Sequence, residues 1–317
     1  MRYISYSAMA LFAGLTFAQT PAEAQVLTIG STNPGGLIHS MASAVAKVLV
    51  DKAHMKVVVV PQGGNTLPSV ASKDIECGLN SIYDMAFFVT GTSYFKGKPK
   101  HPNVKLVAAL LPARLSGYVR ADSDIHSVAD LKGKRVPSEF NAQESIRVAV
   151  EAYLANGGVT WNDIKPVPTQ SIVRGANDMA SGQNDVFFFS VGSGKVAEVD
   201  ASVKGGLRAL SLEESPDKLK ALRAAMPGAY FRTVKPASRM PYVKKPITVL
   251  SYDLVLACHD GVSDDVVYKI TKTLHDNKPA LTKIMPAMRL FDPKRMNIEA
   301  EGVVTHSGAL KFYNEKS

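Results

Sequence analysis

Four short segments of small, polar and glycine residues could bind a small ligand through their backbone. They read Thr32-Asn33-Pro34-Gly35-Gly36, Gly63-Gly64-Asn65-Thr66, Glu139-Phe140-Asn141-Ala142-Gln143 and Ser190-Val191-Gly192-Ser193-Gly194. Each stands where the pattern predicts that a strand ends and a helix begins. It therefore offers unpaired backbone N–H groups and the positive end of a helix dipole. Any one turn could be an ordinary helix cap, but four at one sheet edge favour an anion site.

Candidate ligand-binding residues follow from these turns and from the end of a further strand. In a parallel sheet the carboxyl ends of the strands share one edge, which is where ligands bind. The candidates from the turns are Thr32, Asn33, Gly36, Gly64, Asn65, Asn141, Gln143, Ser190 and Gly192. Asn80 and Ser81 join them because they follow the third predicted strand.

Arg114 and His39 are the ionisable candidates. A helix N-terminus is worth about 0.3–1 kcal/mol to an anion, whereas micromolar binding needs about 8 kcal/mol. A charged hydrogen bond from Arg114, which follows the fourth predicted strand, would add about 1.5–3 kcal/mol. A solvated surface arginine is the alternative for Arg114, and a packed imidazole is the alternative for His39. Tyr83 and Tyr252 are candidates for the wall of a cleft.

The motifs of common enzymes are missing or incomplete. A phosphate-binding loop needs G-x-x-x-x-G-K-[ST]; here Gly194-Lys195 is present, but Phe189 replaces the first glycine and Val196 replaces the hydroxyl residue. The G-x-S-x-G pattern of serine hydrolases is absent. The 7 histidines stand singly, without the spacing of a metal site. We therefore expect a binding protein with no catalytic residue, metal or cofactor; a secreted hydrolase or a ligand-sensing module is the alternative.

Residues 1–24 have the layout of a secretory signal peptide. Arg2 precedes an apolar run over residues 4–17, and Ala22-Glu23-Ala24 supplies the small residues for cleavage after Ala24. The run is shorter than the ~20 residues of a membrane-spanning helix, although an uncleaved anchor is the alternative. The mature chain is expected in the periplasm. There Cys77 and Cys258 could form a disulfide or remain buried thiols, and the sequence leaves both open.

The charge of the chain bears on its partners. The formal net charge is +9, and the Lys and Arg residues are scattered without a run of five. A nucleic-acid-binding surface would need clustered basic residues with interleaved aromatics, so nucleic acid is not expected as a partner. A general positive field favours a small anionic solute instead.

Short apolar runs alternate with amphipathic stretches, which predicts βαβ units and mainly parallel sheets flanked by helices. Strands are predicted over residues 26–29, 57–60, 77–79, 104–111, 186–189 and 247–257, and another begins near Val136. A helix after the first strand should bury Met41, Val45, Val48 and Leu49. Further helices are predicted over residues 141–156 and after the cap residue Ser263.

Several motifs in order along the chain resemble the TAXI-type solute-binding proteins of tripartite (TRAP) transporters. They are Leu27-Thr28-Ile29-Gly30 with the turn to Gly36, Gly63-Gly64 followed by Ser72-Lys73-Asp74-Ile75-Glu76, Val119-Arg120-Ala121-Asp122-Ser123 with Asp130-Leu131-Lys132-Gly133-Lys134-Arg135-Val136, Val262-Ser263-Asp264-Asp265-Val266-Val267-Tyr268, and His306-Ser307-Gly308-Ala309 with Phe312-Tyr313. The resemblance implies an α/β fold with two lobes, the type II periplasmic binding protein fold. Lobe 1 would comprise residues 25–113 and 245–317, and lobe 2 residues 114–244.

The resemblance also implies delivery of the solute to integral-membrane transporter subunits, and we expect the receptor to be a monomer. Members of that family are associated with amino acids and small carboxylates such as glutamate. The sequence differs from the family pattern at two places in the expected pocket. Ile38-His39 stands where the family often has a tyrosine pair, and Gly192-Ser193-Gly194 stands where it often has Gly-His-Pro. Glutamate is therefore not carried over as the ligand.

Overall fold

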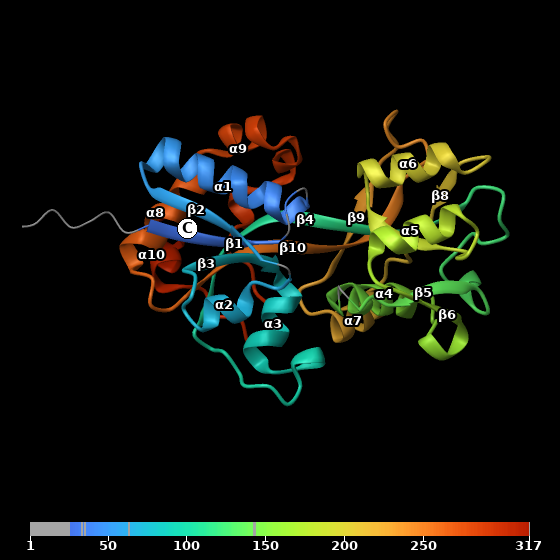
Figure 1. Cartoon of the computed structure of the whole chain (residues 1–317), viewed down its shortest axis with the longest axis horizontal. Helices are drawn as coiled ribbons and strands as arrows, with labels where there is room; N and C mark the ends of the chain where they lie inside the picture. Colours follow the sequence, from blue (N-terminus) through green and yellow to red (C-terminus); the bar gives the residue numbers. More distant parts are fainter. Residues whose placement is uncertain (1–25, 33, 35, 63, 142–143, 317) are drawn as a thin grey trace, which may run out of the picture.

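Two groups of helices and strands are joined by two long strands. The computed structural model describes residues 26–32, 34, 36–62, 64–141 and 144–316, so the predicted signal peptide lies outside the described residues. Figure 1 shows the joining strands, β4 (Val104–Arg120) and β10 (Ile247–His259), running through the middle of the molecule. We call the group that holds β1, β2 and β3 lobe 1, and the group that holds β5 to β9 lobe 2.

The strands and helices divide between these lobes as follows. The remaining strands are β1 (Val26–Ser31), β2 (Lys56–Pro61), β3 (Cys77–Ser81), β5 (Arg135–Glu139), β6 (Lys165–Thr169), β7 (Phe187–Ser190), β8 (Leu207–Ala209) and β9 (Tyr230–Val234). The helices of lobe 1 are α1 (Leu37–Ala53), α2 (Leu67–Ala71), α3 (Ile82–Thr90), α8 (Asp264–Asp276), α9 (Lys278–Ile284) and α10 (Ser307–Lys316). Those of lobe 2 are α4 (Glu144–Asn156), α5 (Ile172–Ala180), α6 (Gly194–Ser202) and α7 (Pro216–Ala225).

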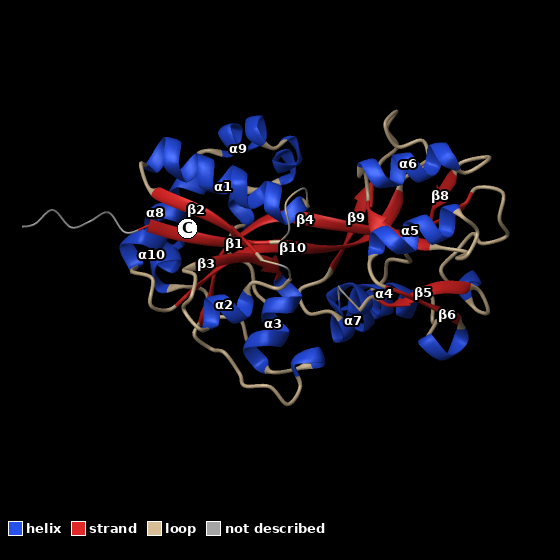
Figure 2. Ribbon diagram, in the orientation of Figure 1, coloured by secondary structure: helices blue, strands red, loops and turns tan. Residues whose placement is uncertain are grey.

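One large sheet passes through both lobes. Its order is β2-β1-β3-β10-β4-β7, with β8 also pairing with β4 and β9 with β10. β1, β2 and β3 are parallel, β10 is antiparallel to its neighbours, and β5 and β6 form a separate parallel pair. Helices lie on both sides of these strands (Figure 2). The carboxyl ends of β1, β2 and β3 therefore share one edge, from which α1, α2 and α3 begin.

Most of the predicted elements are confirmed. α1 buries Met41, Val45, Val48 and Leu49, the apolar face read from their helical spacing. Ser263 caps α8 by accepting a hydrogen bond from the backbone N–H of Val266. The predicted fourth strand and its continuation form the single 17-residue strand β4. The predicted boundary between residues 113 and 114 falls inside this strand, and the division into lobes at that residue stays a prediction.

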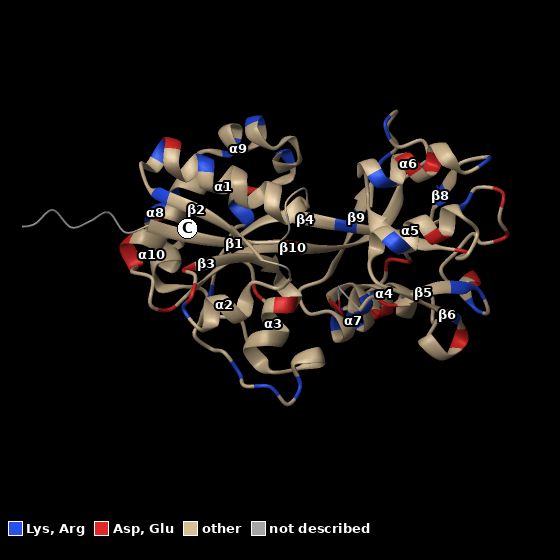
Figure 3. Ribbon diagram, in the orientation of Figure 1, with Lys and Arg blue, Asp and Glu red and all other residues tan. Residues whose placement is uncertain are grey.

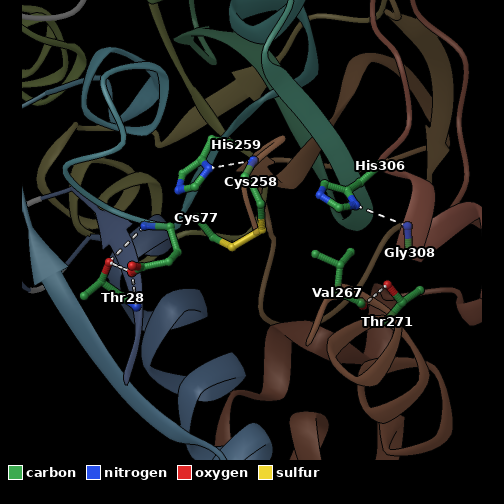
Figure 4. The surroundings of a disulfide bond; sticks show 10 residues. Thr28, Cys77, Cys258, His259, Val267, Thr271, His306 and Gly308 are labelled. Atoms are coloured by element: carbon green, nitrogen blue, oxygen red, sulfur yellow. Dashed lines mark hydrogen bonds between the residues drawn. A yellow bond between two sulfur atoms is a disulfide. The ribbon is translucent and has the colours of Figure 1, made fainter. Parts of the chain in front are cut away.

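The two cysteines form a disulfide, which decides between the alternatives left by the sequence. Cys77 on β3 and Cys258 on β10 are direct partners in the antiparallel register, with Cα atoms 3.9 Å apart. Both are fully buried. Figure 4 shows the bond between Thr28 and His259 on one side and His306 and Val267 on the other. The disulfide ties the strand that returns to lobe 1 to the N-terminal part of that lobe.

Candidate functional site

A cavity of about 780 Å³ lies where the turns of lobe 1 meet the first turns of α4 and α5. We call it the central cavity. Its walls are formed by Thr32, Pro34, Gly36, Ile38, Gly64, Asn65, Leu79, Asn80, Ser81, Tyr83, Asp84, Tyr94 and Phe95 from lobe 1, by Asn141, Glu144, Ser145, Ile146 and Ser171 from lobe 2, and by Tyr252 and Leu254 of β10. A space of this volume suits a small organic metabolite.

The N-terminus of α1 is open toward the central cavity. Gly36 precedes the helix in an extended conformation, and no side chain of the described residues caps the first turn. The first turn also lacks an acidic residue. Because the first N–H groups of a helix have no partner within the helix, this end of the 17-residue α1 offers donors and a positive dipole to a ligand.

Asn80 links the turn after β2 to the end of β3 and has one donor without a partner. Its Oδ1 accepts hydrogen bonds from the backbone N–H and the hydroxyl of Thr66, at 3.3 and 3.1 Å. Gly78 permits this close approach, because a Cβ there would lie 2.2 Å from the Thr66 hydroxyl oxygen. The buried Nδ2 of Asn80 has no hydrogen-bond partner among the described residues. Asn80 is therefore a residue of the cavity wall with an unused N–H donor.

A buried carboxyl group and three tyrosines form another wall. Ser81 caps α3 and donates its hydroxyl to Asp84 at 2.6 Å, and the hydroxyl of Tyr94 also donates to this carboxyl group. Burial raises the pKa of Asp84 to about 7, although the hydrogen bond from Ser81 opposes the shift. The rings of Tyr83 and Tyr252 meet edge to face with centroids 5.0 Å apart.

Lobe 2 supplies the facing wall through the turns after β5 and β6. Asn141 follows two residues with left-handed backbone, Glu139 at φ 66° and Phe140 at φ 51°. Such conformations are costly for residues other than glycine and concentrate at functional sites. Ser171, which caps α5, completes this wall.

The ionisable side chains of the central cavity are acidic. Asp84 and Glu144 line it, and no Lys, Arg or His does so among the described residues. Elsewhere Lys and Arg are spread over both lobes, interspersed with Asp and Glu (Figure 3). Any attraction of an anion into the cavity must therefore come from backbone N–H groups, from amide side chains such as Asn80 and from helix dipoles.

Seven of the thirteen predicted site residues are brought together around the central cavity. They are Thr32, Gly36, Gly64, Asn65, Asn80, Ser81 and Asn141. Asn33 and Gln143 lie outside the described residues. Tyr83 and Tyr252, expected in a cleft wall, also line the cavity.

The other four predicted residues do not line the central cavity. The Nδ1 atom of His39 lies 2.9 Å from the hydroxyl of the buried Ser31. Arg114 donates a hydrogen bond to the backbone carbonyl of Val191 at 3.4 Å. Ser190 is the register partner of Leu115, so it and Gly192 lie beside Arg114 at the end of β7. The fourth predicted turn thus accompanies Arg114 rather than the first three turns.

Several residues that line the cavity were not predicted from the sequence. Ser81 and Asp84 have the S-x-x-D spacing of a capping box, a signal that would have pointed to Asp84. Ser171 was hidden because β6 contains Pro166 and Pro168, which weaken a strand signal. Pro is tolerated in this strand because β5 is its one strand partner among the described residues. No signal in the sequence marks Tyr94 or Phe95 as cavity residues.

Two features of the described residues concern metal ions and membranes. Within them, no group of three or more His, Cys, Asp or Glu side chains is placed to hold a metal ion. No helix in the same part of the chain is long and apolar enough to cross a membrane.

Comparisons with known structures show the fold, and a family model shows the family. The alkanesulfonate-binding protein SsuA from Xanthomonas axonopodis pv. citri, bound to MOPS, is similar with a TM-score of 0.52 and 15% identity, over 88% of this chain and 88% of that chain. A TctC solute binding protein from Polaromonas is similar with a TM-score of 0.53 and 15% identity, over 93% and 96%. Residues 29–317 match the NMT1-like family. The chain therefore belongs to the NMT1-like family and has the two-lobed α/β fold of periplasmic binding proteins.

Proposed function

We propose that the chain is a periplasmic solute-binding receptor without catalytic activity, exported by a signal peptide that is removed after Ala24. It captures a small metabolite with a carboxylate group, either a simple carboxylate or an amino acid, in the central cavity. It then delivers this solute to the membrane subunits of a TRAP-type transporter, as the resemblance to TAXI-type receptors implies.

The observation that carries this proposal is the convergence of three strand-to-helix turns on one cavity. Gly36 and Gly64 come from lobe 1 and Asn141 comes from lobe 2. A ligand that contacts all three turns is held by both lobes at once, and it stabilises the arrangement in which the lobes are close. This is the physical requirement of a receptor that closes around its solute.

The polar groups of the cavity favour a ligand with more than one polar functional group. Its carboxylate is expected at the open N-terminus of α1 and the free Nδ2 of Asn80. Asp84 lies in the same cavity and suits a hydrogen-bond donor on the ligand, such as an ammonium or hydroxyl group. The rings of Tyr94 and Tyr252 supply apolar surface for the body of the ligand.

A thermal-shift screen tests the ligand class. Amino acids, dicarboxylates and aromatic acids are compared with neutral sugars and with amines that lack a carboxylate. A ligand at one hundred times its Kd stabilises the folded chain by about 2.7 kcal/mol, which is a measurable rise in Tm. Stabilisation by sugars or simple amines alone would contradict the proposal.

The pH dependence separates the two carboxylate classes. Below pH 7 Asp84 is mostly neutral, and above it the ionised form repels a second negative charge. A simple carboxylate should therefore bind more tightly at pH 6 than at pH 8. An amino acid whose ammonium group pairs with ionised Asp84 should show the opposite trend.

Asn80→Asp tests the donor at the cavity wall. The substitution keeps the acceptor that holds Thr66 but replaces the free Nδ2 donor with a carboxylate oxygen. The variant loses a charged hydrogen bond and gains a repulsive charge. Its affinity for the carboxylate ligand identified in the screen should therefore fall by about tenfold or more, as measured by calorimetry. The control is Asn297→Asp, an exposed asparagine that accepts a hydrogen bond from Thr305 and should bind normally. Equal affinities in the two variants would remove Asn80 from the site.

A further inference from the structure

The two faces of the ribbon formed by β4 and β10 carry different chemistry. Tyr252 of β10 lines the central cavity. Its neighbour Ser251 must point to the opposite face, because successive side chains of a strand alternate. Ser251 is the direct partner of Arg114 on β4 and of Tyr230 on β9. Directly opposed side chains leave the same face, so Arg114 lies on the side of the ribbon away from the central cavity.

Three further arginines lie around Arg114. Arg232 of β9 is opposite Val249, two residues before Ser251 on β10, and so leaves the same face. Arg239 extends to Gly192, where its Nη1 would lie 3.2 Å from an added Cβ atom. Arg289 belongs to the short helix η4 (Pro286–Leu290), which packs against β4. We call Arg114, Arg232, Arg239 and Arg289 the arginine cluster.

No carboxylate of the described residues is in ion-pair contact with the arginine cluster, although the charge of Asp253 acts on Arg232 from a longer distance. Asp253, on the same face of β10, is already held by the hydroxyl of Tyr230 at 2.9 Å and by Arg295 at 3.4 Å. Burial lowers the pKa of Arg114, and the charges of Arg232, Arg289 and Arg239 lower it further. The other three guanidinium groups are therefore close enough to repel that of Arg114.

A buried hydroxyl group gives an independent sign of an incomplete polar site. Ser251 is fully buried next to Arg114, and its Oγ has no hydrogen-bond partner among the described residues. Buried polar groups of this kind are normally satisfied by protein, water or a ligand. An oxyanion on this face would offset the repulsion that the other arginines exert on Arg114 and would supply a hydrogen-bond acceptor near the Ser251 hydroxyl.

We propose that the arginine cluster is a second anion site, separate from the central cavity, for a small oxyanion with at least two negative charges. Planar guanidinium groups bind the oxygens of such anions in pairs. Arg289 comes from lobe 1, Arg114 from the joining strand, and Arg232 and Arg239 from lobe 2. An anion bound there bridges the two lobes and stabilises their present arrangement.

Orthophosphate is the probe for this site, and the solute of the central cavity is not needed. At constant ionic strength and pH 7.5, phosphate should raise the Tm of the full chain, whereas chloride should not. In the double variant Arg232→Gln/Arg239→Gln the phosphate affinity should fall by about tenfold or more, since two charged contacts are lost. The matched control Lys220→Gln/Lys316→Gln removes two exposed charges elsewhere and should respond like the wild type.

Two further variants assign the site and its bridging role. Arg289→Gln should weaken phosphate binding although it changes lobe 1 alone, while Asn80→Asp should leave it unchanged. A phosphate shift that survives in the Arg232→Gln/Arg239→Gln variant, or that disappears with Asn80→Asp, overturns the second site. Equal loss in the lysine control would show a general charge effect and would also overturn it. Neither result bears on the carboxylate screen, so the two proposals fail independently.

Discussion

Asp84 places an ionisable group inside the central cavity whose charge changes near neutral pH. Burial raises its pKa from 3.8 to about 7 in the folded chain. Below about pH 4 both the folded and the unfolded chain hold this proton. As the pH rises from 4 through 7, the unfolded chain releases the proton while the folded chain retains it. Asp84 therefore lowers the free energy of unfolding progressively over that window.

Asp84→Asn should remove this dependence. An uncharged amide avoids the cost of burying an anion, so the variant should exceed the wild type by about 1–3 kcal/mol in free energy of unfolding at pH 8. The difference should shrink toward zero near pH 4. Urea denaturation at several pH values measures both. Glu299→Gln, at an exposed position, is the control and should follow the wild-type curve. A pH-independent difference for Asp84→Asn would mean that its ionisation is not the cause.

At the scale of elements, the disulfide joins strands from opposite ends of the chain. Cys77 and Cys258 are 181 residues apart in the sequence but adjacent in the register of β3 and β10. A cross-link over such a long loop restricts the unfolded chain strongly, and typical disulfides contribute about 2–4 kcal/mol. β10 is thus fixed to lobe 1 near one end.

The variant Cys77→Ala/Cys258→Ala should lower the free energy of unfolding by about 2–4 kcal/mol. Reductant should lower the stability of the wild type to a similar extent once urea exposes the buried sulfurs. The double variant, in contrast, should unfold at the same urea concentration with and without reductant. A wild type that is insensitive to reductant throughout its unfolding transition would show that the disulfide is not formed in solution.

At the scale of the whole molecule, a direct hydrogen bond crosses from one lobe to the other beside the central cavity. The hydroxyl of Tyr83 on α3 donates to the backbone carbonyl of Ser145 on α4 at 3.2 Å. The ring of Tyr83 is buried against Tyr252 of the joining strand β10. Tyr83 therefore contacts lobe 1, lobe 2 and the ribbon between them, and it favours the closed arrangement.

Tyr83→Phe should shift the unliganded chain toward an open arrangement. A hydrogen bond contributes about 0.5–1.5 kcal/mol net, so the affinity for the solute should fall by about two- to tenfold while the packing of the ring is kept. Calorimetry measures the affinity, and small-angle scattering should show a larger radius of gyration without ligand. Tyr268→Phe removes a hydrogen bond to Glu315 within lobe 1 and is the matched control. An unchanged radius and affinity for Tyr83→Phe would show that this contact does not hold the lobes.

The sequence by itself determined the local elements and part of the site. Spacing predicted the buried face of α1, and short apolar runs predicted β1, β2, β3 and β10. Glycine and polar residues at strand ends predicted three turns that meet in the central cavity. These predictions hold because periodicity, capping and backbone freedom are local properties, fixed within a few residues of the chain.

The tertiary structure alone decided which of these residues meet. Tyr252 lines the central cavity with Asn80, so its neighbour Ser251 lies on the opposite face of the β4–β10 ribbon. Arg114 is the direct partner of Ser251 and therefore lies on that opposite face too. A one-residue step along a strand reverses the face of a side chain, and strand register depends on packing between segments far apart in sequence. For the same reason the disulfide between Cys77 and Cys258 and the burial that raises the pKa of Asp84 could not be read from the chain alone.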